Sequence, residues 1–351
     1  MRKEKVKVAI WGFGAMGSGM AKMILKKQGF DIVGVCDLNL NYLGKSIFEI
    51  LNLNNPYNHD VLIKEHIEDI VSEGSCDIVM LATDSFTKKA YDKITWLLER
   101  KVNVISTAEE MAFPKAKEPL LAEQMDKIAK ANGVSVLGTG INPGMMMDLL
   151  VVAMTGVMED LTEIDVARIN SLSPFGRTVM EEQGVGLSVG EFNKKLENDE
   201  MAGHVGFLES TQMIAAGIAQ EVESFSQTME PIVSDVERKS SYGFVQKGNV
   251  AGVNMSAKAL TNTGIKINMS HPQQIEPQLG GIKTGDYIKI KGIPEVNLSI
   301  TPEIDGGIGT IAICVNMIPH VINAKAGLVT MLDLPVPRAI MGDVRKMIKE
   351  E

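Results

Sequence analysis

Apolar and polar positions follow two alternating periods along residues 1–143. Short apolar runs predict five β-strands, at residues 6–11, 31–36, 77–83, 102–107 and 134–138. Segments with the 3.6-residue period of an amphipathic helix lie between them, at residues 18–27, 87–100 and 117–131. Strands that alternate with helices in this way are typical of an α/β domain built on a parallel, doubly wound sheet.

The pattern changes at about residue 144. Strict alternation over residues 161–170 predicts a strand that places Ile164, Val166, Arg168 and Asn170 on one face. A helix is then expected to begin at Ser188, because apolar residues recur after it at helical spacing.

Later elements complete an α+β domain. Residues 287–291 and 296–300 alternate on either side of a short turn and predict a hairpin. The apolar run 308–317 predicts a buried helix that Pro319 closes. We therefore expect a first domain over residues 1–143, an α+β domain for substrate binding and dimerisation over 144–319, and a strap, 320–351, that ends in a charged helix and returns to the first domain.

A glycine-rich turn links the first predicted strand to the first predicted helix. The residues are Gly12, Phe13, Gly14, Ala15, Met16 and Gly17. In a Rossmann-type dinucleotide site the first glycine permits the turn, the second lets the backbone approach a diphosphate, and the third lets the helix pack closely. The free N–H groups at the helix start attract the anion. The alternative is a tight turn in a domain that binds no nucleotide.

Asp37 ends the second predicted strand, 20 residues after Gly17. A carboxylate at that spacing binds the adenosine ribose in dinucleotide-binding domains, and it repels a 2′-phosphate. We therefore expect NAD as the cofactor. NADP stays possible because Lys45 could reach a phosphate, and in a nucleotide-free domain Asp37 would only cap a loop.

Further loops follow other strands of the same predicted sheet, and each is expected to meet the cofactor. They contain Ala82, Thr83, Thr107, Ala108, Asn142 and Pro143. Ligands bind beyond the carboxyl ends of parallel strands, so these loops should frame the nicotinamide. Taken singly, each is also an ordinary turn. Asn316, within the apolar helix, is either a satisfied core amide or another cofactor contact.

Polar residues of the second domain are candidates for substrate binding. Arg168 and Asn170 end an inward strand face, which suits a pocket, although the strand could also leave the core there. Arg177 lies in the loop that follows. Gly184 and Gly186 precede a helix start, where they either bind a carboxylate or only give flexibility.

Composition narrows the choice of partners. The net charge is −9 and the basic residues are scattered, which argues against nucleic acid and favours a small-molecule enzyme. No segment has the length and apolarity of a membrane span, and no secretory signal fits the N-terminus, so we expect a cytoplasmic protein. Cys36, Cys76 and Cys314 are expected to be buried thiols. His59, His66, His271 and His320 show no metal-ligand spacing with one another or with cysteine.

Several motifs together resemble the 2,4-diaminopentanoate dehydrogenases. They lie at residues 12–17, 106–110, 138–144, 316–319 and 326–335. The resemblance implies a homodimer that uses NAD(P) for oxidative deamination at C4 of a diamino acid in ornithine breakdown, giving 2-amino-4-oxopentanoate and ammonia. The overall plan is similar to dihydrodipicolinate reductase, but Arg168-Ile169-Asn170 stands where that enzyme has paired histidines.

Amine oxidation needs a general base, and three residues are candidates for it. Glu110, the favoured base, follows a strand beside Glu109, and the two carboxylates could bind a cationic amine while one of them takes a proton. They could also merely begin a helical turn. His204, which lies between Gly203 and Gly206, is a second catalytic candidate or a simple loop residue. Another amino-acid oxidoreductase and a non-catalytic NAD sensor are the alternative functions.

Overall fold

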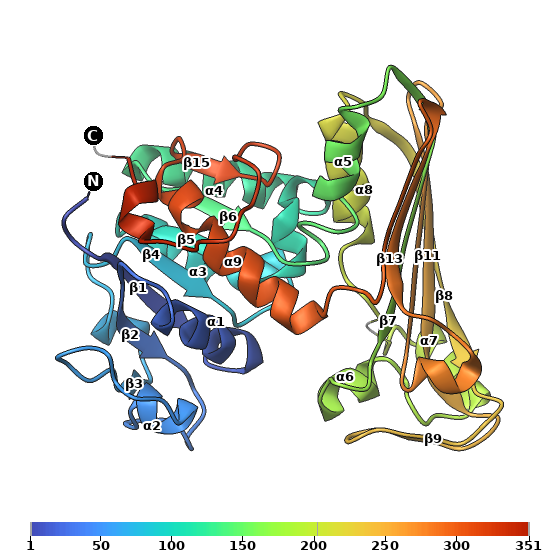
Figure 1. Cartoon of the computed structure of the whole chain (residues 1–351), viewed down its shortest axis with the longest axis horizontal. Helices are drawn as coiled ribbons and strands as arrows, with labels where there is room; N and C mark the ends of the chain where they lie inside the picture. The colour runs from blue at the N-terminus through green and yellow to red at the C-terminus, as the bar shows by residue number, and fades with distance from the viewer. Residues whose placement is uncertain (1, 202, 350–351) are drawn as a thin grey trace. The chain divides into compact units, whose positions relative to one another are not determined.

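The computed structural model describes residues 2–201 and 203–349 (Figure 1). The chain divides into two compact units: a first unit, Met1–Met145 with Asp305–Glu351, and a second unit, Met146–Ile304. The sequence places residues 305–319 in the second domain, whereas this division puts them in the first. The reason is helix α9 (Gly306–Ile322), which contacts α1 and strands β4, β5 and β6 of the first unit.

The first unit is built on a seven-stranded sheet in the order β15-β6-β5-β4-β1-β2-β3, in which every pair of neighbours is parallel. The predicted doubly wound α/β sheet is therefore confirmed. Its strands are β1 (Val6–Trp11), β2 (Phe30–Cys36), β3 (Ile63–Lys64), β4 (Ile78–Leu81), β5 (Asn103–Ser106), β6 (Ser135–Gly138) and β15 (Gly327–Val329).

Helices cover both faces of this sheet (Figure 1). α1 packs against α9, and α3 packs against α4 with the buried apolar residues of the strands between. The remaining helical segments of the first unit are short. Besides α9, the helices of this unit are α1 (Ala15–Leu25), α2 (Ile47–Leu51), α3 (Thr87–Leu98), α4 (Pro119–Asn132) and the 3₁₀ helices η1 (Ile67–Asp69), η2 (Glu109–Ala112), η3 (Pro114–Ala116) and η5 (Val344–Met347).

Two predictions for the C-terminal part are wrong. Helix α9 does not stop at Pro319 but continues through it to Ile322. Proline removes one helical hydrogen bond, yet Met317, Ile318 and Val321 are fully buried, and that burial keeps the last turn in place. The charged tail forms only the short η5 instead of an α-helix. Backbone hydrogen bonds such as Val344 N–H to the Gln28 carbonyl (3.1 Å) fasten it to the first unit.

The second unit contains a six-stranded mixed sheet in the order β14-β13-β7-β12-β11-β8, with one parallel pair, β7 and β12. Its strands are β7 (Asp160–Ser171), β8 (Val222–Val233), β11 (Val250–Thr261), β12 (Lys266–Gln274), β13 (Gly285–Ile293) and β14 (Val296–Ile300). The other elements are a small ribbon, β9 (Arg238–Lys239) and β10 (Phe244–Val245), and helices α5 (Leu149–Thr155), α6 (Arg177–Glu182), α7 (Val189–Glu197), α8 (Phe207–Gly217) and η4 (Pro277–Gly280).

The inward face of β7 has the composition that the alternation predicts. Ile164, Val166, Arg168 and Asn170 are all buried. The first two belong to the apolar core of the unit, which also contains Phe207 of α8. The polar end of this face therefore stays inside the protein instead of leaving for solvent.

The three cysteines are buried and unpaired, as the sequence predicts. Burial is the main cause that raises the pKa of each thiol to about 12. They are protonated at neutral pH and serve as small apolar side chains.

The turn that joins β1 to α1 leaves no room for a side chain at Gly17. A Cβ there would lie 1.8 Å from the Gly12 carbonyl oxygen. Gly17→Ala is therefore expected to cost about 3 kcal/mol, or roughly 10 °C in the melting temperature measured by calorimetry. Gly14→Ala is the control, because no atom lies within 4 Å of a Cβ at that position. Equal melting temperatures for the two variants would contradict this account of the turn.

Candidate active site

The glycine turn forms an open cradle at the carboxyl end of β1. Gly12 has φ +94, and a Cβ there would lie 2.5 Å from the Ala82 carbonyl oxygen. Gly12 and Gly17 are buried, whereas Gly14 and Ala15 are exposed, with open space beside Gly14. The backbone of Gly14 is thus accessible to an anion, as a dinucleotide diphosphate requires.

The start of α1 is left uncapped. Gly14 is its N-cap and offers no side-chain hydrogen bond, and the first turn, which contains Met16, holds no acidic residue. The N–H groups of a first helical turn have no partner within the helix, so an anion can accept from them. The residues present therefore fit a bound dinucleotide.

Asp37 follows β2 and supports the same turn. Its carboxylate accepts the Phe13 N–H at 2.5 Å and the Asn39 N–H at 2.7 Å. A carboxylate has about four acceptor positions, so two are left for ribose hydroxyls. Asp37 thus fixes the glycine turn and keeps the capacity to bind a nucleotide.

The other predicted cofactor loops lie at the same edge of the sheet. Ala82 and Thr83 follow β4, and Thr107 and Ala108 follow β5, its neighbour. The Thr107 N–H donates to the Leu81 carbonyl at 3.0 Å, which keeps the two strand ends together. The exposed Thr83 hydroxyl donates to Asp84 and accepts from Lys93.

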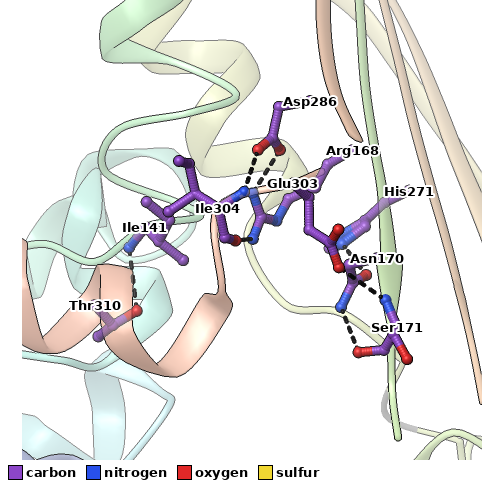
Figure 2. A network of polar contacts seen from close by, with 9 residues as sticks. All are labelled: Ile141, Arg168, Asn170, Ser171, His271, Asp286, Glu303, Ile304 and Thr310. Carbon is purple, nitrogen blue, oxygen red and sulfur yellow. Dashed lines mark hydrogen bonds and ion pairs between the residues drawn. The ribbon is translucent and has the colours of Figure 1, made fainter. Parts of the chain in front are cut away.

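The loop after β6, which includes Asn142 and Pro143, is held by α9. The Ile141 N–H donates to Thr310 Oγ1 at 3.2 Å (Figure 2), and the Cys314 thiol reaches the Thr139 carbonyl. Asn316, expected at the cofactor, instead accepts the Ile340 N–H at 3.2 Å. This contact supports its interpretation as a structural amide that secures the tail.

Glu109 and Glu110 begin the 3₁₀ helix η2 and differ in burial. Glu110 is 2% exposed; its Oε2 accepts the Thr87 N–H at 2.8 Å and its Oε1 accepts from Lys117 at 2.6 Å. Both oxygens therefore serve the start of α3 and an ion pair. Glu109 is only partly buried.

Arg168 belongs to a buried ion pair in the second unit. Its Nη1 lies 2.5 Å from Asp286 Oδ1, and Nη2 donates to the Ile304 carbonyl (Figure 2). Asp286 Oδ2 also accepts the Ile304 N–H at 2.9 Å. Arg168 and Asp286 thus clamp both polar groups of one peptide residue, and the charge of the arginine is already compensated. This geometry does not support Arg168 as the anchor for a substrate carboxylate.

A histidine pair, His271 buried and His204 partly buried, lies beside that clamp. The rings of His204 and His271 meet edge to face with centroids 4.6 Å apart. His271 Nε2 lies 3.0 Å from Asn170 Oδ1, and because an amide oxygen only accepts, the histidine donates (Figure 2). Burial lowers the pKa of His204 to about 4, with the Arg168 charge as a second cause. Burial, then His204 and Arg168, hold the pKa of His271 well below its usual value.

The other three predicted substrate residues, Arg177, Gly184 and Gly186, make contacts within the protein. Arg177 is 84% exposed and pairs with Glu181 at 3.4 Å within α6. The Gly184 N–H donates to the Glu181 carbonyl, and the Gly186 N–H donates to the Val250 carbonyl. These amides are used within the protein, and they do not form the expected carboxylate site.

The helix start after Gly186 is also closed. Ser188 and Glu191 form a capping box at the N-terminus of α7, so this helix supplies its own carboxylate.

Sequence reasoning missed His271 and Asp286. His271 follows Ile267 and Met269 at period two on β12, and these three residues are buried. That alternation places it on the inward face and is the signal that could have identified it. The pairing of β13 with β7, which brings Asp286 opposite Arg168, has no comparable local signal.

Residues 2–201 and 203–349 contain no helix long and apolar enough to cross a membrane. The same ranges contain no group of three His, Cys, Asp or Glu side chains that could hold a metal ion.

Comparisons with known proteins agree with this architecture. Residues 6–130 match the dihydrodipicolinate reductase N-terminus. Among solved structures, an amine dehydrogenase from Mycobacterium smegmatis superposes with a TM-score of 0.84 at 23% identity, covering 96% of this chain and 98% of that one. A probable dehydrogenase from Thermotoga maritima gives 0.59 at 10% identity, covering 93% and 92%. At these identities the likeness concerns the fold.

Closer similarity comes from sequence. Residues 145–350 match the 2,4-diaminopentanoate dehydrogenase C-terminal domain. A 2,4-diaminopentanoate dehydrogenase from Acetoanaerobium sticklandii is 56% identical over 349 residues, which cover 99% of this chain and 98% of that protein. The chain therefore belongs to the 2,4-diaminopentanoate dehydrogenase family.

Proposed function

We propose that this chain catalyses the NAD(P)-dependent oxidative deamination of 2,4-diaminopentanoate at C4, giving 2-amino-4-oxopentanoate and ammonia. The observation that carries the proposal is the 56% identity to the Acetoanaerobium sticklandii enzyme over nearly the whole of both chains. The open cradle at Gly14, together with the uncapped start of α1, supports it independently.

NAD is the proposed cofactor, and when bound its nicotinamide would accept the hydride from C4. The uncapped start of α1 would hold the diphosphate, and Asp37 would hold the ribose through its remaining acceptor positions. A negative charge at Asp37 disfavours the 2′-phosphate of NADP. Use of NADP stays the alternative, because Lys45 is exposed and its charge could reach the 2′-phosphate.

The reaction also needs a general base, and a side chain of the protein must supply it. The C4 ammonium has to lose a proton before hydride can leave, and a proton is released again when water adds to the iminium carbon. Glu110 is buried and engaged at both oxygens, which makes it a positioning residue for η2 and α3. We assign the base to Glu109, which is partly buried directly after β5.

His204 is the second candidate for the base. Its ring is neutral at pH 7 because its pKa is about 4, so it can accept a hydrogen bond from an ammonium group. The same low pKa makes it a weak proton acceptor, which favours the carboxylate for proton transfer. We propose that His204 contacts substrate and that Arg168 and Asn170 position the histidine pair.

The family resemblance carries two more proposals: a homodimer and a role in ornithine breakdown. We also propose a cytoplasmic enzyme, as the sequence leads us to expect. The net charge of −9 is consistent with a small-molecule enzyme.

Cofactor reduction should depend on the diamino acid. With 2,4-diaminopentanoate and NAD, we expect the absorbance of the reduced nicotinamide to rise and one ammonia to form for each cofactor reduced. The KM should be lower for NAD than for NADP. Ornithine, other diamino acids and homoserine are the comparison substrates. Faster turnover of one of these would favour a different amino-acid oxidoreductase, and NAD binding without any turnover would favour a sensor.

The two adjacent glutamates should separate turnover from stability. Glu109→Gln is expected to lower kcat by about 100-fold or more with an unchanged Kd for NAD, because it removes the base. Glu110→Gln should lower the melting temperature and leave kcat within a few-fold, because it weakens the contact with Lys117. The reverse result, with turnover lost only in a stable Glu110→Gln protein, would return the base to Glu110.

The histidine pair should make the folded protein sensitive to acid. The unfolded chain protonates histidine near pH 6.5, whereas burial keeps His204 neutral down to about pH 4. The unfolded state therefore binds more protons in this window, and stability should fall as pH drops from 6.5 towards 4. Melting temperatures between pH 6.5 and 5 should fall less steeply in His204→Asn than in the exposed control His66→Asn. Identical slopes would show that His204 titrates normally.

A further inference from the structure

A cavity of about 620 Å³ lies in the first unit, away from the glycine turn. It is bordered by residues at the starts of β6 and β15: Gly327 pairs with Ser135, and the Lys325 carbonyl accepts from the Ser135 hydroxyl at 3.0 Å. The glycine turn follows the carboxyl end of β1 in the same parallel sheet. The cavity is thus at the amino edge of the sheet, opposite the cofactor cradle.

Positive charge predominates around this cavity. Lys130 is paired with Asp126 at 2.7 Å, and Asp333 accepts from the N–H and hydroxyl of Thr330. The other charged side chains of the lining are Lys325, Arg338 and Lys349. Within residues 2–201 and 203–349, these three have no carboxylate within 4.0 Å.

A buried histidine in the lining lacks a partner. His320 is 5% exposed, and its Nε2 has no hydrogen-bond partner among the described residues. Buried polar atoms are nearly always satisfied, so an unsatisfied ring nitrogen in a cavity wall points to a missing ligand. Burial, and secondly Arg338, lower the pKa of His320. Its neutral ring can donate or accept one hydrogen bond.

We propose that this cavity binds a small organic anion. Its carboxylate or phosphate group contacts Arg338 and Lys325, and a polar atom of the same molecule meets Nε2 of His320. Leu328, Val329 and Leu334 supply an apolar wall for the carbon skeleton. The volume is within the range of small-molecule sites, and a guanidinium is suited to both kinds of anion.

Calorimetric titration of the NAD-saturated protein tests the site, because the cofactor cradle is then filled. The probes are citrate, 3-phosphoglycerate and inorganic phosphate at constant ionic strength. We expect saturable binding of one molecule per chain for citrate or 3-phosphoglycerate, and weaker binding of inorganic phosphate, which lacks an organic part. Tighter binding of citrate would indicate a carboxylate site, and tighter binding of 3-phosphoglycerate, which also has a carboxylate, would show that the phosphate group adds affinity.

Variants locate the binding. Arg338→Gln and Lys325→Gln alter exposed side chains and should each raise the Kd of the better probe about tenfold. Lys127→Gln, which alters an exposed lysine of α4 outside the cavity lining, is the matched control and should bind as the wild type does. The ring nitrogen signals of His320, assigned with His320→Asn, should shift when the probe is added.

Two results would overturn the proposal. One is the absence of saturable binding for all three probes up to 10 mM, a concentration that corresponds to roughly 3 kcal/mol of binding free energy. The other is an equal loss of affinity in Lys127→Gln, which would show that net charge, and not this cavity, attracts the anion.

Discussion

The close approach of Gly17 to the Gly12 carbonyl is the contact on which the first unit depends. It brings the first turn of α1 against the end of β1, so the helix begins directly at the edge of the sheet. Asp37 reinforces the arrangement from the next strand by accepting the Phe13 N–H. The exposed, uncapped helix start is a consequence of this packing, and it is the feature that fits the diphosphate of a dinucleotide.

Buried charges in this protein are mostly committed to its own backbone. Glu110 caps the start of α3 while it pairs with Lys117, and Arg168 with Asp286 clamps the peptide groups of Ile304. Desolvation explains the pattern, because an ionised group inside a protein is tolerated only when its partners replace water. The groups proposed for chemistry differ: Glu109 keeps some exposure, and His204 avoids the cost by staying neutral.

Helix α9 connects the two edges of the first sheet. Near its start, Thr310 and Cys314 hold the loop after β6, and near its end, His320 lines the cationic cavity. Its 17 residues span about 25 Å. Pro319 is accommodated inside this helix because the surrounding apolar contacts outweigh one lost hydrogen bond. The helix therefore belongs to the core of the first unit, even though the sequence suggests that it belongs to the second domain.

The sequence by itself determined the elements whose signals are local. The alternation of strands and helices defined the parallel sheet, the glycine spacing identified the cradle, and the period of two placed Arg168 and Asn170 on an inward face. These features follow from backbone geometry within a few residues, so they can be read without knowledge of the rest of the chain.

Only the tertiary structure decided which polar residues are committed to structural contacts. Glu109 and Glu110 are adjacent and chemically identical, but they differ in burial, and Glu110 is bound by Thr87 and Lys117. Asp286 meets Arg168, and Asn316 meets the tail at Ile340, across more than 20 residues of chain. A side chain's partners depend on which strands pair and which faces are buried, and those are properties of the whole packed chain, not of its local pattern.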